Sequence, residues 1–375
     1  MTVIILAVLP QQLFSAERPE LIEIRTDKER YQGKLIAHNK QDSWILGRDG
    51  QIHKISIRDV RGFRKLSSKF RGISASELRT QLRRNFGKNY EIVGSGHYLV
   101  IAQKGRARQF AKIFEETYRS VYGYLSVYGF RLRQPKYPLV AVVFSSHIEF
   151  IKQASRDGVN NPVGVLGYYS RRNNRIVLFE PTPKIRRVSQ QPQNGPFSDK
   201  VFGDLRRPSG IRPSLFDTMI HETTHQVSFN VGLHSRIGQC PIWIVEGLAT
   251  MFEASGVRNR KGRRGSLVRA NRERLAGFFS FAQKRRKKNS LASFIASDKM
   301  FRDSTLDAYS QAWALTFFLM ETRSRQFSDY LKLIAKRDPL KPYTSKARLA
   351  DFRKIFGDDL DRLENDFLRF IQRLK

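Results

Sequence analysis

Residues 221–225 are His-Glu-Thr-Thr-His (HETTH), and residues 241–253 are PIWIVEGLATMFE. Both stretches have the pattern of a helix. A helix that begins at Pro213 and ends before Gly232 would contain the first stretch, because proline favours the first turn of a helix and glycine favours its end. Pro241 then opens a second helix that runs to about Ala254. The sequence therefore predicts two consecutive helices joined by a short loop.

The spacing of the two histidines points to a metal site. Four residues turn a helix by about 400°, so His221 and His225 leave the same face and can reach one ion at about 2.0–2.1 Å. Glu222 leaves about 100° away, where it can meet a water molecule beside the ion. Composition alone would produce this pattern roughly 0.006 times in a chain of this length. The motif therefore predicts a zinc hydrolase.

A third ligand is expected on the second helix. Catalytic zinc takes three protein ligands and keeps one open position, and a carboxylate from a neighbouring helix is one known solution. Glu246 stands in an apolar segment, where a carboxylate without a partner would be costly. We therefore expect His221, His225 and Glu246 to hold Zn²⁺ and Glu222 to activate the water. The alternatives are structural zinc without catalysis, a degenerate pseudo-enzyme, or histidines that are only packed.

HETTH followed by WIVEGLAT resembles the gluzincin clan of zinc metallopeptidases. This clan includes thermolysin and aminopeptidases with a Trp-x-x-Glu-Gly-x-Ala pattern on the second helix. The chain is most similar to the peptidase MA-like families, largely uncharacterised bacterial proteins with GHYLV-like and GYYS-like strands before the motif. The resemblance covers roughly residues 87–325. It implies a zinc-binding cleft between a mixed sheet and a helical lobe, and it does not imply a substrate.

A donor for the charge that develops during hydrolysis is also expected. The resemblance favours Tyr309, since related peptidases use a downstream tyrosine or histidine there; the alternative is a core tyrosine beside Trp313 and Phe317. His234 is the second candidate. If the strand RIVLFE (175–180) forms the sheet edge on which a peptide lies, Tyr168 and Tyr169 would line the cleft, although buried aromatic residues are the alternative.

Two carboxylates are candidates to orient the histidines. Histidine ligands usually donate their second ring N–H to a carboxylate or a carbonyl. Asp217 lies one helical turn before His221, and Glu253 lies seven residues after Glu246, so each shares a face with a ligand. The alternative for both is a solvated helix surface.

The rest of the chain predicts an α+β protein with a zincin-like catalytic domain. Residues 20–68 show four or five short alternating strands with an Asp49-Gly50 turn, which predicts a small SH3-like β-barrel. It would serve as a binding module or only as a packing appendage. Residues 87–212 are expected to form the sheet lobe and residues 213–375 the helical lobe, with a linker or short helix over residues 65–88.

Charge is the most unusual global property. The 375 residues include 68 Lys and Arg against 34 Asp and Glu, a formal net charge of +34. Basic segments at 258–264 and 284–288 follow the metal helices. Such a field favours acidic peptide or protein substrates, or an anionic surface or polymer; solvated loops are the alternative. No sequence motif for specific nucleic-acid recognition is present, so a nucleic-acid-binding function would rest on charge alone.

The location of the protein is a separate expectation. Residues 1–16 resemble a short secretory leader without a basic start or a clear cleavage site, so we expect export to the periplasm or the exterior; a cytoplasmic protein with an N-terminal strand is the alternative. No segment approaches the length of a membrane span. The single cysteine, Cys240, excludes an intramolecular disulfide. A catalytically inactive scaffold with a basic surface is the alternative function.

Overall fold

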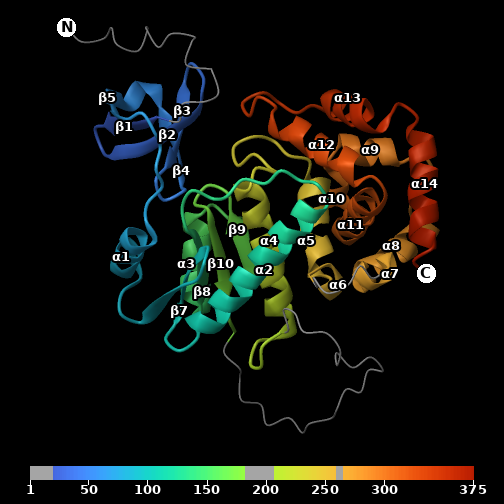
Figure 1. The fold of residues 1–375 in the computed structure, drawn as a ribbon, viewed down its shortest axis with the longest axis horizontal. Coiled ribbons are helices and arrows are strands. Elements are labelled where there is room, and N and C mark those ends of the chain that lie inside the picture. The colour runs from blue at the N-terminus through green and yellow to red at the C-terminus, as the bar shows by residue number, and fades with distance from the viewer. Residues whose placement is uncertain (1–19, 182–206, 259–264) are drawn as a thin grey trace. The chain divides into compact units, whose positions relative to one another are not determined.

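The computed structural model describes residues 20–181, 207–258 and 265–375 (Figure 1). The predicted leader at 1–16, most of the connection at 183–212 and the basic segment after Arg258 lie outside these residues. The chain forms two compact units, Met1–Ser74 and Ala75–Lys375. The described part is α+β, with an N-terminal antiparallel sheet, a mixed sheet and a helical C-terminal region.

The first unit is a five-stranded antiparallel sheet in the order β4-β3-β2-β1-β5. Its strands are β1 (Leu21–Thr26), β2 (Arg30–His38), β3 (Asp42–Gly47), β4 (Ile52–Ser56) and β5 (Val60–Ser67). The predicted Asp49-Gly50 turn joins β3 to β4, and Gly50 has a φ of 83°, which glycine adopts without strain. Ile22, Ile24, Ile45 and Ile55 form its core. The pairing among these described strands does not close the sheet, so the SH3-like barrel stays a prediction.

The second unit contains a mixed sheet in the order β6-β7-β8-β10-β9. The strands are β6 (Tyr90–Gly94), β7 (Tyr98–Gln103), β8 (Leu139–Phe144), β9 (Gly167–Ser170) and β10 (Arg175–Phe179). Strands β7, β8 and β10 are parallel, and the two edge strands run antiparallel to their neighbours. The condition that RIVLFE forms the sheet edge is not met: β10 lies inside the sheet, and β9 (GYYS) is the edge strand.

Helices cover this sheet. Phe110, Phe114 and Val121 form a buried stripe on α2 (Ala107–Val127), which packs on β6 and β7. Helix α3 (His147–Arg156) packs Phe150 against Phe179 of β10, and α1 (Ala75–Phe86) contacts β6. Residues 65–88 were expected to form either a linker or a short helix, and α1 shows that they contain a helix.

The helical region begins with the two motif helices. Helix α4 (Pro213–Asn230) packs on β9 and β10, and α5 (Ile242–Glu253) packs between α4 and α11 (Thr305–Thr322). Both motif helices begin and end within one residue of the predicted bounds. The other helices are α6 (Ser255–Arg258), α7 (Ser266–Arg269), α8 (Arg272–Lys284), α9 (Leu291–Ala296), α10 (Lys299–Asp303), α12 (Ser324–Ala335), α13 (Ser345–Phe356) and α14 (Leu360–Gln372).

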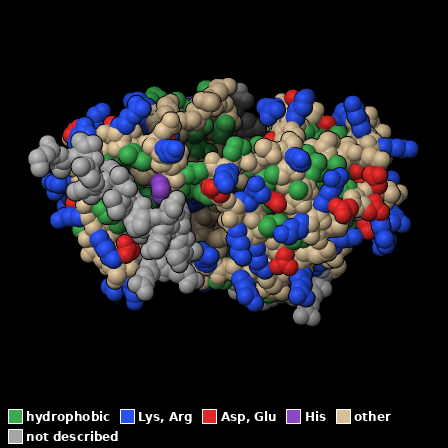
Figure 2. All heavy atoms as spheres, turned by 90° about the horizontal axis from the view of Figure 1, so that it is seen from above, with side chains coloured by type: hydrophobic (Ala, Val, Ile, Leu, Met, Phe, Trp, Pro, Cys, Tyr) green, Lys and Arg blue, Asp and Glu red, His purple; other side chains and the backbone are tan. Residues whose placement is uncertain are grey.

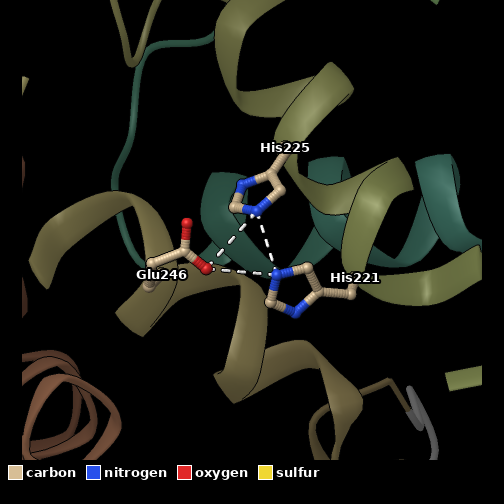
Figure 3. A group of neighbouring side chains, drawn as sticks. All are labelled: His221, His225 and Glu246. Atoms are coloured by element: carbon tan, nitrogen blue, oxygen red, sulfur yellow. Dashed lines mark hydrogen bonds and ion pairs between the residues drawn. The ribbon is translucent and has the colours of Figure 1, made fainter. Parts of the chain in front are cut away.

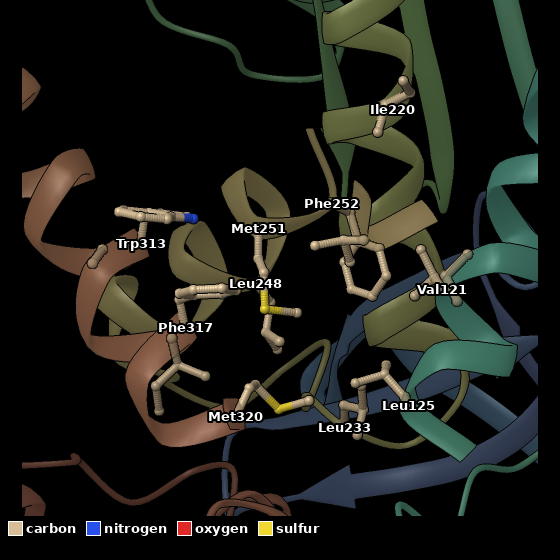
Figure 4. Packing of buried hydrophobic residues seen from close by; sticks show 14 of the residues in the cluster. Val121, Leu125, Ile220, Leu233, Leu248, Met251, Phe252, Trp313, Phe317 and Met320 are labelled. Carbon is tan, nitrogen blue, oxygen red and sulfur yellow. The ribbon is translucent and has the colours of Figure 1, made fainter. Parts of the chain in front are cut away.

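A continuous apolar core fixes α5 in place. Figure 4 shows Leu248, Met251 and Phe252 of α5 between Trp313 and Phe317 on one side and α2 on the other. All five of these side chains are buried. Because α5 is held from both sides, its polar face, which carries Glu246, has little freedom to move relative to α4.

Candidate metal centre

Three side chains from α4 and α5 converge at one point (Figure 3). The Nε2 atoms of His221 and His225 lie 3.0 Å apart. One carboxylate oxygen of Glu246, Oε2, lies 3.2 Å from Nε2 of His221 and 3.6 Å from Nε2 of His225. The structure therefore brings together the three residues that the sequence predicts as ligands, and their ligand atoms can all face one small ion.

The separations fit a tetrahedral cation. An ion held at about 2.0–2.1 Å from each ligand atom separates those atoms from one another by about 3.3 Å. The measured distances of 3.0, 3.2 and 3.6 Å bracket that value. Two imidazole nitrogens and one carboxylate oxygen are also the donor set that suits zinc. The residues present therefore fit Zn²⁺.

Glu253 orients His221 from the other side of its ring. Its Oε1 atom lies 2.8 Å from Nδ1 of His221. A proton on Nδ1 would be donated to this carboxylate, which leaves the Nε2 lone pair directed toward His225 and Glu246. The second oxygen of Glu253 accepts a hydrogen bond of 3.0 Å from Asn271 and lies 3.7 Å from Nε of Arg274. Glu253 therefore occupies the place that its spacing predicts.

Asp217 does not take such a position. It lines the same cavity as His221, but it makes no hydrogen bond or ion pair with either histidine in the described part of the chain. Its pKa is raised by burial, while the charges of Arg258 and Arg207 act in the opposite direction. Of the two carboxylates expected to orient a histidine, only Glu253 therefore lies in a position to do so.

The electrostatics of the cluster favour added positive charge. Burial lowers the pKa of His221, but hydrogen bonds with Glu246 and Glu253 outweigh it and hold that pKa well above the usual range. Burial raises the pKa of Glu246, and the charge of His225 and the hydrogen bond with His221 reverse this effect and hold it far below the usual range. The negative potential of Glu246 and Glu253 that favours a proton on His221 would also favour a divalent cation.

Glu222 lies next to the cluster on the face that opens to the cavity. Burial raises its pKa, while the charges of His225 and His221 and a hydrogen bond from the backbone of Tyr169 lower it; the net change is upward. This carboxylate is thus more basic than an ordinary glutamate. Tyr169 belongs to the edge strand β9, so Glu222 lies between the cluster and the sheet edge.

Tyr309 also belongs to the site. Its hydroxyl group lies close enough to the Glu246 carboxylate for that group to raise its pKa, and its ring lies 6.5 Å from the ring of His221. Burial, followed by the charge of Glu246, raises its pKa above the usual range, so the hydroxyl keeps its proton. Tyr309 is half-buried in the second turn of α11, whereas Trp313 and Phe317 are fully buried. It is therefore not a simple core tyrosine.

The remaining aromatic and histidine candidates lie elsewhere. The Tyr168 hydroxyl donates to Asp157 and the Tyr169 hydroxyl donates to Asn174, so both are tied into the sheet. His234 is buried, its Nδ1 lies 3.6 Å from Sγ of Cys240, and burial lowers its pKa to about 3. It makes no contact with the cluster among the described residues.

Sequence reasoning missed the residues that fix α4 on the sheet. The buried Gln226 donates hydrogen bonds to the carbonyl groups of Val140 in β8 and Asn174 beside β10. Asn230 donates to Asn174 as well, at 2.7 Å. The sequence gives one hint, because Gln226 lies seven residues after Met219 and next to Val227, on the apolar side of the helix, where a polar residue is unusual. These bonds hold α4, and with it Glu222, against the edge of the sheet.

A cavity of about 400 Å³ adjoins His221 and Glu222. Its wall includes residues 165–167 beside β9, Asp217 and Thr218 of α4, Glu253 of α5, and Asn271, Glu273 and Arg274 at the start of α8. The residues from α8 were not predicted. The cavity has the size of a pocket for a small ligand or one large side chain.

Two of the basic side chains in the segment at 284–288 are already paired with carboxylates of the protein. Arg286 forms a buried ion pair with Glu364, and Arg285 pairs with Asp307. Lysine and arginine side chains are scattered over the visible face in Figure 2 without forming one patch. In the described residues, no helix has the length and apolar character needed to cross a membrane.

Comparison with known proteins gives a limited result. No curated protein matches the sequence. A family model described as "Protein of unknown function (DUF1570)" matches about a third of the chain. A DUF1570 domain therefore covers residues 216–341, and it contains all three residues of the cluster together with Glu222, Glu253 and Tyr309.

Proposed function

We propose that this protein is a zinc-dependent metallopeptidase of the gluzincin type, in which Glu222 activates water for hydrolysis of a peptide bond. The convergence of Nε2 of His221, Nε2 of His225 and Oε2 of Glu246 within 3.6 Å carries the proposal. The base beside them, the open cavity and the mixed sheet next to a helical lobe support it further.

Each residue has a distinct role. Zinc, when bound, supplies Lewis acidity, which makes a water molecule more acidic and a peptide carbonyl more electrophilic. Glu222 accepts the proton of the attacking water and delivers it to the leaving amine, so the products are a carboxylate and an amine. Its raised pKa suits both steps, because it is a stronger base than an ordinary glutamate.

Tyr309 and the edge strand complete the arrangement. The protonated hydroxyl of Tyr309 can donate to the carbonyl oxygen as negative charge develops there. Gly167 of the edge strand β9 lies in the cavity wall. An extended peptide can add to such an edge and present its scissile bond to Glu222. Glu253, Asn271 and Gln226 hold these groups in position.

The test combines metal analysis with digestion of an unbiased peptide library. We expect the wild-type protein to contain zinc and to cleave peptides in a reaction that a chelator stops. Glu222→Gln should keep the zinc and lose the cleavage, because the amide cannot accept the proton. Zinc without cleavage of any peptide would instead support an inactive scaffold protein, and equal cleavage by Glu222→Gln would reject the role of this residue.

A further inference from the structure

The cavity beside His221 and Glu222 is acidic, although the protein as a whole carries a net charge of +34. Among the described residues, its wall holds four carboxylates, from Asp217, Glu222, Glu253 and Glu273, and one arginine, Arg274. The cavity adjoins the proposed catalytic base, so a substrate that reaches Glu222 must occupy it or pass it. The location of the cavity beside Glu222 is an observation separate from its charge. Because of this location, the side chains in the cavity wall would influence which substrates are accepted.

Two of the carboxylates are already balanced. Glu253 hydrogen-bonds with His221 and lies 3.7 Å from Arg274, so this arginine is already paired. Glu222 serves as the base of the proposed reaction, with the cationic metal centre beside it. Neither carboxylate is therefore available to a side chain of the substrate.

Asp217 and Glu273 remain. Among the residues that the structure describes, neither forms an ion pair or a hydrogen bond through its carboxylate. They lie close enough for the charge of Glu273 to raise the pKa of Asp217. The charges of Arg258 and Arg207 act on Asp217, but the side chains of both arginines donate to carbonyl groups: Arg258 to Phe252 and Glu253, and Arg207 to Ile211. Asp217 and Glu273 are both exposed, and among the described residues neither is paired directly with a cation.

Other residues in the cavity wall are apolar. Val165 and Leu166 precede β9 and line the cavity together with Gly167. Apolar residues next to carboxylates suit a long basic side chain, since its aliphatic stem packs on apolar groups while its charged end pairs with carboxylates. A lysine or arginine side chain also suits the cavity's volume of about 400 Å³.

We propose that Asp217 and Glu273 make the enzyme selective for peptides with lysine or arginine next to the scissile bond. This inference rests on the proposed peptidase function. It differs from the acidic substrate that net charge predicts, because surface charges are screened beyond about 8 Å whereas the cavity acts at contact distance.

The test uses one peptide series in which a single position carries lysine, arginine, norleucine or glutamate, scanned along both sides of the cleaved bond. Norleucine matches the length of the lysine stem without its charge. We expect kcat/KM to be roughly tenfold higher for lysine than for norleucine at one position next to the bond, since a tenfold ratio corresponds to about 1.4 kcal/mol. In Asp217→Asn/Glu273→Gln the ratio of lysine to norleucine should fall toward one.

Asp361→Asn is the matched control, because it removes an exposed carboxylate on α14, outside the cavity wall. It should leave the ratio unchanged. A second readout does not need turnover: Glu222→Gln should bind the lysine peptide more tightly than the norleucine peptide in calorimetry. Cleavage without preference for lysine or arginine, or a ratio unchanged in the double variant, overturns the inference. If no peptide is cleaved, the proposed function fails, and equal binding of the two peptides then overturns the inference as well.

Discussion

Gly247 of α5 and Thr316 of α11 are in such close contact that a methyl group added at Gly247 would lie 2.1 Å from Oγ1 of Thr316. It would also lie 2.6 Å from the backbone oxygen of Ala312. Gly247 directly follows Glu246, and α11 carries Tyr309 about one turn before Ala312 and two turns before Thr316. The absence of a side chain at Gly247 therefore lets the two helices approach closely enough for the charge of Glu246 to act on the Tyr309 hydroxyl.

Gly247→Ala is expected to push α5 and α11 apart. The backbone oxygen of Ala312 cannot move aside, so overpacking should lower the free energy of unfolding by about 1–3 kcal/mol, as measured by urea titration. The shift of Glu246 should also weaken zinc binding. Gly265→Ala is the control, since no described residue lies within 4 Å of the added methyl group there. Unchanged stability in Gly247→Ala would contradict the close packing of these helices.

Glu253→Gln should weaken zinc binding by about 10- to 100-fold, because the ligand His221 loses the carboxylate that orients its ring. The measurement is competition with a chelator of known affinity. Asn271→Ala should give a smaller loss in the same direction, since Asn271 acts on the metal only through Glu253. An affinity in Glu253→Gln equal to that of the wild type would show that the 2.8 Å contact does not support the metal.

Tyr309→Phe should keep its zinc and lower kcat by about 10- to 100-fold, because it removes a donor to the developing negative charge. KM should change less than kcat, since the donor acts mainly on the transition state. Tyr122→Phe is the control: its hydroxyl makes only a weak bond of 3.4 Å to the carbonyl group of Leu132. If kcat in Tyr309→Phe matches that of Tyr122→Phe, Tyr309 only supports Glu246.

Glu115 is expected to govern stability in mild acid. Burial raises the pKa of Glu115, but hydrogen bonds from His97 and Ser95 outweigh it, so the net pKa is lowered. A lowered carboxyl pKa stabilises the fold above the pKa of the unfolded chain, about 4.3, and this stabilisation is lost as the pH falls through the folded value. As the pH falls below 5, the melting temperature of the wild type should therefore fall more steeply than that of Glu115→Gln. If the two melting temperatures change with pH in parallel, Glu115 does not govern stability in acid.

The motif helices could be predicted from the sequence because the signals that define them lie close together along the chain. The spacing of His221 and His225 on one helix and the apolar surroundings of Glu246 each indicate where a side chain points. Glu253 could be found in the same way, from its position on the helix of Glu246. Pro213, Pro241 and Gly232 gave the bounds of these helices for equally local reasons.

Relationships set by distant packing could not be predicted. Strands β9 and β10 have similar short apolar patterns, and only the parallel pairing of β10 with β8 decides that β9 is the edge. Asn271 and Arg274 reach Glu253 because α8 packs beside α11, and no spacing rule links them to the motif. Arg286 belongs to a basic run, yet its partner Glu364 lies far along the chain and buries it.

Zinc stoichiometry tests the central claim most directly. Mass spectrometry of the native purified protein should find one zinc ion per wild-type chain. Glu246→Ala should lose it, because two imidazoles alone do not complete a three-ligand site. His147→Ala, which removes an exposed histidine outside the cluster, should retain it. A wild-type chain that binds no zinc when it is supplied, or Glu246→Ala with full zinc occupancy, would contradict the account.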